Sequence, residues 1–204
     1  MPKNTKLFIQ RIEEKIADLE SKSAVEIVPV LVERSAHYYE MRIVWGLTFL
    51  FLSRELFSLL GHWDVWTQAL GCILVFSLSQ LLFLWPAFLR FFVPKRLRNF
   101  EVQETAHLCF LKEEIFATKN RTGLLIFISE LEKGVFVLAD KGLTAQFPSQ
   151  YWAELGLKLA KDFSSNKAGD VFLEAIAEIS PKLIQDFPVK DQDSNELSNN
   201  LRRG

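Results

Sequence analysis

Three acidic side chains stand where this sequence could place the carboxylates of a phosphoryl-transfer site. Asp140 ends a predicted strand and is followed by Lys141, Glu26 lies on the first predicted strand, and Asp170 opens the last predicted helix. Phosphoryl chemistry needs a nucleophile or a metal-held water, with cationic or N–H groups around the phosphate. Asp140, together with Glu26 or Asp170, is therefore the candidate catalytic group of a metal-assisted phosphatase.

Each of these residues also has a structural explanation, which we favour. An Asp at a strand end is a common turn former, and an Asp in the first turn of a helix is stabilised by the helix dipole. Glu26 can point to solvent from an edge strand. His107 and Cys109 are two residues apart on a predicted helix and face different directions, which makes a poor metal pair. The residues themselves predict no metal site, no cofactor and no glycine-rich phosphate loop.

The most informative feature is an apolar block that predicts a transmembrane helical hairpin over residues 41–93. Residues 65–89 contain no charged side chain, and a bilayer needs about 20 residues of helix. Residues 43–60 have about the minimum spanning length, so residues 61–65 form the turn. Two other arrangements stay open, a buried helical pair in a soluble core and a hairpin that enters the membrane from one side without crossing it.

Three polar side chains fall inside the predicted spans: Arg54, Glu55 and Gln80. Arg54 can extend its charge toward the lipid headgroups, whereas the shorter Glu55 is expected near the interface or paired within the hairpin. Gln80 is accommodated if it faces another helix. These residues could bind within one hairpin or between several, so a homo-oligomer formed through the hairpin is one expectation.

Basic residues flank the hairpin and are absent from its turn. Arg34 and Arg42 precede the first span, and the second is followed by Arg90, Lys95, Arg96 and Arg98. The positive-inside rule then places both termini in the cytoplasm. The run after the second span also predicts contact with anionic lipid headgroups. The formal net charge of −1 and a pI near 6.3 give no basic field for nucleic acid, so none is expected as a partner.

The segments around the hairpin read as one α/β domain. Helical periodicity covers residues 4–22 and 100–119, with Ala106, Phe110 and the row Leu108, Leu111 and Ile115 supplying the apolar face of the second helix. Strands are expected at 24–33, 124–129 and 135–140, and two further helices at 149–163 and 168–187. The fold class is α/β, a small mixed sheet flanked by helices and interrupted by the hairpin. The domains are 1–40, 41–93 and 94–188, and a polar tail at 189–204 is expected to be disordered.

Several motifs in a fixed order resemble the TPM domain family, and more narrowly its bacterial membrane subfamily with two spans inserted in the TPM domain. The resemblance runs from about residue 8 to residue 188. It is carried by EIVPVLVERSAHYY (26–39), NRTGLLIFISELEKGVFVLADKG (120–142), YW (151–152), AGD (168–170) and DFP (186–188).

The resemblance implies a central sheet between helices and a place in the bacterial inner membrane. It also implies acid phosphatase activity or Ca²⁺ binding in some relatives, so that Ca²⁺ or Mg²⁺ would be the metal, and an association with LemA-type membrane proteins in others. This sequence departs from the phosphatase pattern at two places. Ser35, Ala36 and His37 lack the acid found in relatives after the first strand, and Thr144, Ala145 and Gln146 lack the acid found near DKG.

The sequence therefore predicts an integral membrane protein with a cytoplasmic TPM-like domain. We expect it to act without catalysis, as an interaction or maintenance factor for a membrane complex. The alternative is a metal-assisted phosphatase at the membrane surface.

Overall fold

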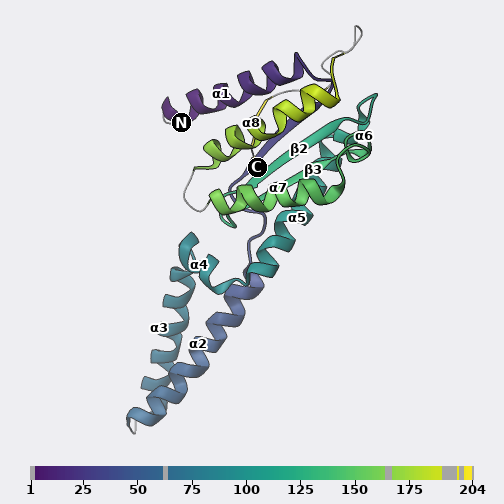
Figure 1. The fold of residues 1–204 in the computed structure, drawn as a ribbon. Coiled ribbons are helices and arrows are strands. Elements are labelled where there is room, and N and C mark those ends of the chain that lie inside the picture. The colour runs from purple at the N-terminus through teal and green to yellow at the C-terminus, as the bar shows by residue number, and fades with distance from the viewer. Residues whose placement is uncertain (1–2, 62–63, 164–166, 190–196, 198–199, 204) are drawn as a thin grey trace. The chain divides into compact units, whose positions relative to one another are not determined.

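The computed structural model describes residues 3–61, 64–163, 167–189, 197 and 200–203. The chain forms two compact units (Figure 1). We call Met1–Ser35 with Asn99–Gly204 the sheet unit, and Ala36–Arg98 the hairpin unit. The predicted hairpin at 41–93 lies within the second unit.

A mixed four-stranded sheet organises the sheet unit, as expected from the sequence. Its strands are β1 (Glu26–Val32), β2 (Gly123–Ser129), β3 (Gly134–Ala139) and β4 (Arg202–Arg203), in the order β3-β2-β1-β4. β1 runs parallel to β2 and β4, whereas β2 and β3 form an antiparallel hairpin. The two central strands, β1 and β2, are buried on both faces. Their sequences are therefore nearly continuous runs of β-branched residues and leucine. The α/β fold class is thereby confirmed.

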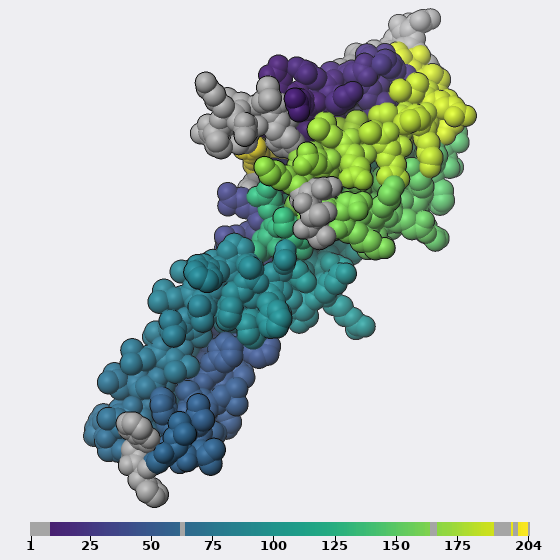
Figure 2. Space-filling view, turned by 60° about the vertical axis from the view of Figure 1, so that its left-hand side comes forward, coloured from purple at the N-terminus to yellow at the C-terminus, as the bar shows by residue number. Residues whose placement is uncertain are grey.

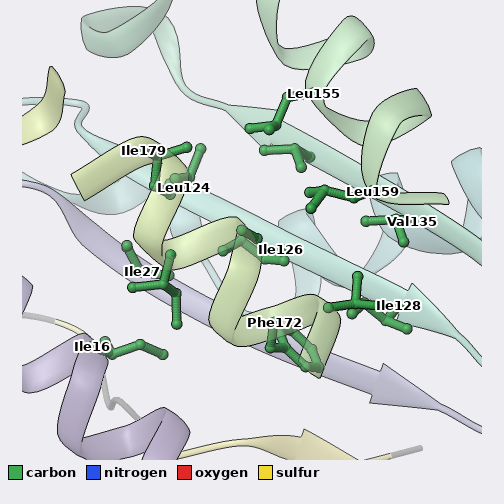
Figure 3. Packing of buried hydrophobic residues seen from close by; sticks show 14 of the residues in the cluster. Ile16, Ile27, Leu124, Ile126, Ile128, Val135, Leu155, Leu159, Phe172 and Ile179 are labelled. Atoms are coloured by element: carbon green, nitrogen blue, oxygen red, sulfur yellow. The ribbon is translucent and has the colours of Figure 1, made fainter. Parts of the chain in front are cut away.

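One face of the sheet is covered by three helices: α1 (Lys3–Glu20), α7 (Ser149–Asp162) and α8 (Ala168–Asp186). α1 and α8 lie side by side, and α7 covers β3 (Figures 1 and 2). Figure 3 shows Phe172 and Ile179 of α8 among side chains of the central strands, with Ile16 of α1 in the same cluster. α8 continues through Pro181 to Asp186.

The opposite face of the sheet packs against α5 (Lys95–Lys112), followed by the short 3-10 helix η1 (Ile115–Ala117). Val102, Ala106 and Phe110 recur every four residues and form the buried stripe of α5. The apolar face predicted for this helix was therefore partly wrong. Leu108 and Leu111 are 64% and 59% exposed, because they lie on the side of α5 that faces away from the sheet.

The C-terminal segment contains an ordered strand where the sequence analysis expected a disordered tail. Arg202 and Arg203 pair with Val30 and Leu31 of β1, and the guanidinium of Arg202 forms an ion pair with Glu113. Leu201 and Leu197 pack against the hydrophobic clusters on the two faces of the sheet. Residues 190–196 and 198–199 lie outside the described residues.

The hairpin unit consists of α2 (Tyr39–Leu60), α3 (Val65–Leu82) and α4 (Pro86–Phe92). Asp64 caps α3 by accepting hydrogen bonds from the N–H groups of Trp66 and Thr67. The second helix is shorter than the predicted 65–89. It ends at Leu82, and α4 starts at Pro86, because the residue before a proline is driven out of the helical region and Trp85 is extended (φ −79°, ψ 122°).

α2 and α3 approach each other closely at glycine. A Cβ on Gly46 would lie 2.3 Å from the Gln80 amide nitrogen and 2.8 Å from the Phe76 ring, so a larger residue here would displace these two side chains. The Ser53 hydroxyl lies 3.6 Å from the Cys72 sulfur across the same interface. The two helices are long and apolar enough to cross a membrane, and 11% of the apolar window of each is buried.

The contact between Ser53 and Cys72 predicts a cross-link. We expect Ser53→Cys to form an intramolecular disulfide with Cys72 on mild oxidation, because the present oxygen–sulfur distance already brings the two side chains into bonding reach. The bond is detected by mass spectrometry of peptides from the oxidised full-length protein. Phe51→Cys is the matched control, since Phe51 is 60% exposed and turned away from α3. Equal cross-linking of both variants would contradict the helix pairing.

Candidate functional site

Asp140 lies directly after β3, as predicted, but both oxygens of its carboxylate are already bound. Arg121 donates from Nε to Oδ2 at 2.7 Å and from Nη2 to Oδ1 at 2.9 Å. The N–H of Lys141 donates to Oδ1 at 2.7 Å and makes Asp140 the N-cap of the short helix α6 (Lys141–Thr144). The residue is 5% exposed. This carboxylate is an acceptor held by a guanidinium and a helix N-terminus.

Arg121 reaches Asp140 from the turn before β2. Its guanidinium also lies over the ring of Phe116, 5.9 Å from the centroid. The hydrogen bonds to Asp140 raise the pKa of Arg121 above its ordinary value. The RTG and DKG motifs of the sequence therefore meet at one point, where a bidentate ion pair joins the start of β2 to the end of β3.

Gly142 explains why a glycine follows Asp140 and Lys141. A Cβ at this position would lie 2.5 Å from the carbonyl oxygen of Asn120 and 2.6 Å from that of Arg121. The N–H of Gly142 donates to the Arg121 carbonyl at 2.8 Å. The close approach of these two turns accounts for the glycine.

Glu26 lies at the same end of the sheet as Asp140. It pairs with Gly123 across the β1–β2 ladder, and Gly123 in turn accepts the N–H of Asp140 at 2.9 Å. Two strand spacings separate the backbones of the two acids, on the order of 10 Å. The Glu26 carboxylate is buried and accepts the N–H of Leu197 at 3.3 Å. It holds the C-terminal segment beside β1.

Asp170 lies far from the end of the sheet that carries Asp140 and Glu26. It is exposed in the first turn of α8, and the opposite end of that helix contacts the start of β1, where Phe187 accepts the N–H of Ala24 at 2.8 Å. At 1.5 Å per residue, Asp170 lies about 25 Å along α8 from that point. The structure therefore does not bring Asp170 together with Asp140 or Glu26, and a catalytic pair that uses Asp170 is wrong.

Glu132 is a buried acid that sequence reasoning missed. It lies at the carboxyl ends of β1 and β2, the edge where parallel sheets usually bind ligands. Its carboxylate accepts the Ser129 hydroxyl and the N–H of Ser35, the latter at 3.2 Å from each oxygen. These contacts tie the end of β1 to the β2–β3 turn. A continuous apolar strand followed by charged residues carries no signal for such a buried acid.

Among the described residues, no group of three or more His, Cys, Asp or Glu side chains could hold a metal ion. His107 donates from Nδ1 to the Gln103 carbonyl of its own helix, at 2.7 Å. Burial raises the pKa of the Cys109 thiol, and the charge of Glu113 adds to this effect. Cys109 is thus protonated at neutral pH and is a weak nucleophile.

In the hairpin unit, two of the three predicted polar residues bind each other, and the third binds the backbone of the neighbouring helix. Arg54 donates to the carboxylate of its neighbour Glu55, and both side chains are more than half exposed. Gln80 donates to the Arg42 carbonyl at 3.3 Å, between α3 and the start of α2. The basic residues lie on α4 and on the first turn of α5, as Arg90, Lys95, Arg96 and Arg98.

Comparison with known proteins finds a similar fold but assigns no activity. No protein-family model and no curated protein sequence matches the chain. One solved structure does, the NMR structure of the BA42 protein from the psychrophilic bacterium Bizionia argentinensis. It has 16% sequence identity, a TM-score of 0.58, and coverage of 97% of this chain and 92% of that chain. BA42 has a TPM-domain-like fold, so the expected fold is supported, whereas membership of the TPM family stays a prediction.

The pairing of Arg121 with Asp140 predicts a structural role for Asp140. We expect Asp140→Ala and Arg121→Ala each to lower the free energy of unfolding, with a coupling of about 1–2 kcal/mol because Arg121 is partly exposed to solvent. Urea denaturation of both single variants and the double variant measures it. Asp170→Ala serves as the control and should cost less than about 1 kcal/mol. A coupling of zero would contradict this role.

Proposed function

We propose that this protein is an integral membrane protein whose TPM-like sheet unit is a non-enzymatic interaction module. The observation that carries the membrane placement is the exposure of α2 and α3. These helices pack on each other, yet large apolar side chains such as Leu59, Trp66 and Leu70 are 85%, 83% and 60% exposed. Core helices of a soluble protein would be mostly buried. A lipid bilayer is the solvent in which such surfaces are stable.

The basic residues around the hairpin support an orientation. They flank α2 and follow α3, whereas the sequence between the two helices contains none. This distribution favours two crossings with both termini in the cytoplasm. The resemblance to the TPM subfamily favours the inner membrane of a bacterium as the location.

The sheet unit offers a surface for a partner. Phe100, Leu108 and Leu111 lie along one side of α5 and are 55%, 64% and 59% exposed. We call these three residues the α5 stripe. They lie opposite the stripe that covers the sheet, so they have no role in the described core. Exposed apolar residues gathered on one helix side favour contact with another protein.

The internal use of the carboxylates favours binding over catalysis. Asp140 is held by Arg121, Glu26 by the C-terminal segment and Glu132 by the loop after β1. A phosphatase would need such groups directed at a substrate. The TPM resemblance favours a LemA-type membrane protein as the partner.

Cysteine labelling tests the orientation. In a Cys109→Ser background, we expect Leu60→Cys to react with a membrane-impermeant maleimide on intact cells, because Leu60 is 68% exposed at the end of α2. Lys112→Cys, exposed in the sheet unit, should react only after lysis. Removal of the protein from membranes by alkaline carbonate, without detergent, would overturn the membrane placement itself.

The α5 stripe gives the test of the interaction. We expect Leu108→Arg with Leu111→Arg to abolish co-purification of the partner in mild detergent while the protein stays in the membrane fraction. Leu157→Arg is the matched control, because Leu157 is equally exposed on α7, at 61%. Purification of the bare protein under every condition would count against an interaction module. Hydrolysis of a phosphomonoester with Ca²⁺ or Mg²⁺ that is lost in Asp140→Ala would establish the phosphatase instead.

A further inference from the structure

We propose that the hairpin unit contains a binding site for one anionic phospholipid. An acyl chain lies in a groove between α2 and α3, and the phosphate is bound by basic side chains where α2 and α4 meet. This inference rests on the proposed membrane placement and adds a specific ligand to it.

The groove has a volume of about 370 Å³, within the range of sites for small molecules. Its sides are formed by Phe49, Leu52 and Leu56 of α2 and by Val75, Leu78 and Leu82 of α3, with Phe88 of α4 at one end. Two hydroxyls also line it, and both are satisfied inside their own helices. Ser53 donates to the Leu50 carbonyl at 2.8 Å, and Ser79 donates to that of Phe76 at 2.6 Å. The groove therefore suits a hydrocarbon chain.

At the Phe88 end of this groove, three helices of the hairpin unit meet. The Trp45 indole N–H donates to the Phe92 carbonyl at 3.2 Å, which joins the beginning of α2 to the end of α4. The Phe92 ring lies 5.5 Å from that of Phe83, directly after α3. Arg42 lies one turn before Trp45, and Arg90 lies two residues before Phe92. The helix segments that carry these two cations therefore meet at that end of the apolar groove.

These cations have no anionic partner in the part of the hairpin unit that the structure describes, although the Arg42 guanidinium lies 6.0 Å from the centroid of the Tyr39 ring. Arg42, Arg90, Lys95 and Arg96 form no ion pair there. The Arg42 Nε is buried without any hydrogen-bond acceptor. A buried guanidinium N–H normally has an acceptor, and a phosphate provides several oxygens with the complementary charge.

A phospholipid fits better than another transmembrane helix. Helices that bind in membranes usually do so over glycine, alanine or serine, which allow close approach. The sides of this groove are built from leucine, phenylalanine and valine, and the two glycines of the pair, Gly46 and Gly71, already contact α3 and α2 respectively. The hairpin unit offers an apolar groove followed by cations. This order matches the acyl chain followed by the anionic phosphate in a phospholipid.

The test uses the full-length protein in a neutral detergent. We expect phosphatidylglycerol to raise its melting temperature more than phosphatidylcholine does, and native mass spectrometry to detect the bound lipid. Arg90→Ala with Lys95→Ala and Arg96→Ala should weaken phosphatidylglycerol binding on the order of a hundredfold, since each basic group near a lipid surface contributes about 1 kcal/mol. The matched control removes the same charge from the sheet unit, at Lys15, Lys112 and Lys167, and should bind as the unmodified protein does.

A second variant tests the groove separately from the cations. Leu52→Trp fills it from the exposed side and should weaken binding of phosphatidylglycerol with long acyl chains. Inorganic phosphate should not reproduce the stabilisation. Equal effects of the two lipids, full stabilisation by phosphate alone, or a change of oligomeric state in Leu52→Trp without loss of lipid binding would each overturn the proposal. If the triple variant loses lipid preference but stays in the membrane, the membrane placement holds; release into buffer would refute that placement.

Discussion

The parallel ladder between β1 and β2 is the interaction on which the rest of the sheet unit depends. It pairs Glu26 with Gly123 and continues to Val32 and Ser129, so the two strands that form the centre of the sheet come from opposite sides of the hairpin in the sequence. Neither flank can bury both faces of its strand alone. Once the ladder forms, α1, α7 and α8 cover one face and α5 covers the other. The insertion is tolerated because loop-closure entropy grows slowly with length.

The same ladder decides what the buried acids do. At its start, Glu26 and the Arg121–Asp140 pair hold the C-terminal segment and the turn after β3. At its end, Glu132 joins Ser129 to Ser35. At both ends of the sheet, these acidic groups make internal contacts. This internal use of the charged groups is the basis of our proposal that the sheet unit binds a partner.

Much of the fold could be predicted from the sequence, because the strands are β-branched and the helices have clear periodicity. The buried face of α5 could not be predicted, because its sequence has two apolar stripes. Only the tertiary fold buries Ala106 and Phe110 and leaves Leu108 and Leu111 exposed. Hydropathy gives no sign of the helix break before Pro86, because the residues on both sides of the break are equally apolar. The two-residue β4 has no periodicity to detect. The Arg121–Asp140 pair spans 19 residues of sequence and depends on the geometry of the β2–β3 hairpin.

The order of strands in the sheet differs from their order of synthesis. β1 leaves the ribosome before the hairpin unit, and its partner β2 is made only after that unit. β4, which covers the other edge of β1, comes later still, after α8. Throughout this interval β1 is a nascent apolar segment with two open edges, the state in which strands pair with the wrong chain. The first strand must therefore wait for its native partner until the whole hairpin unit has been synthesised.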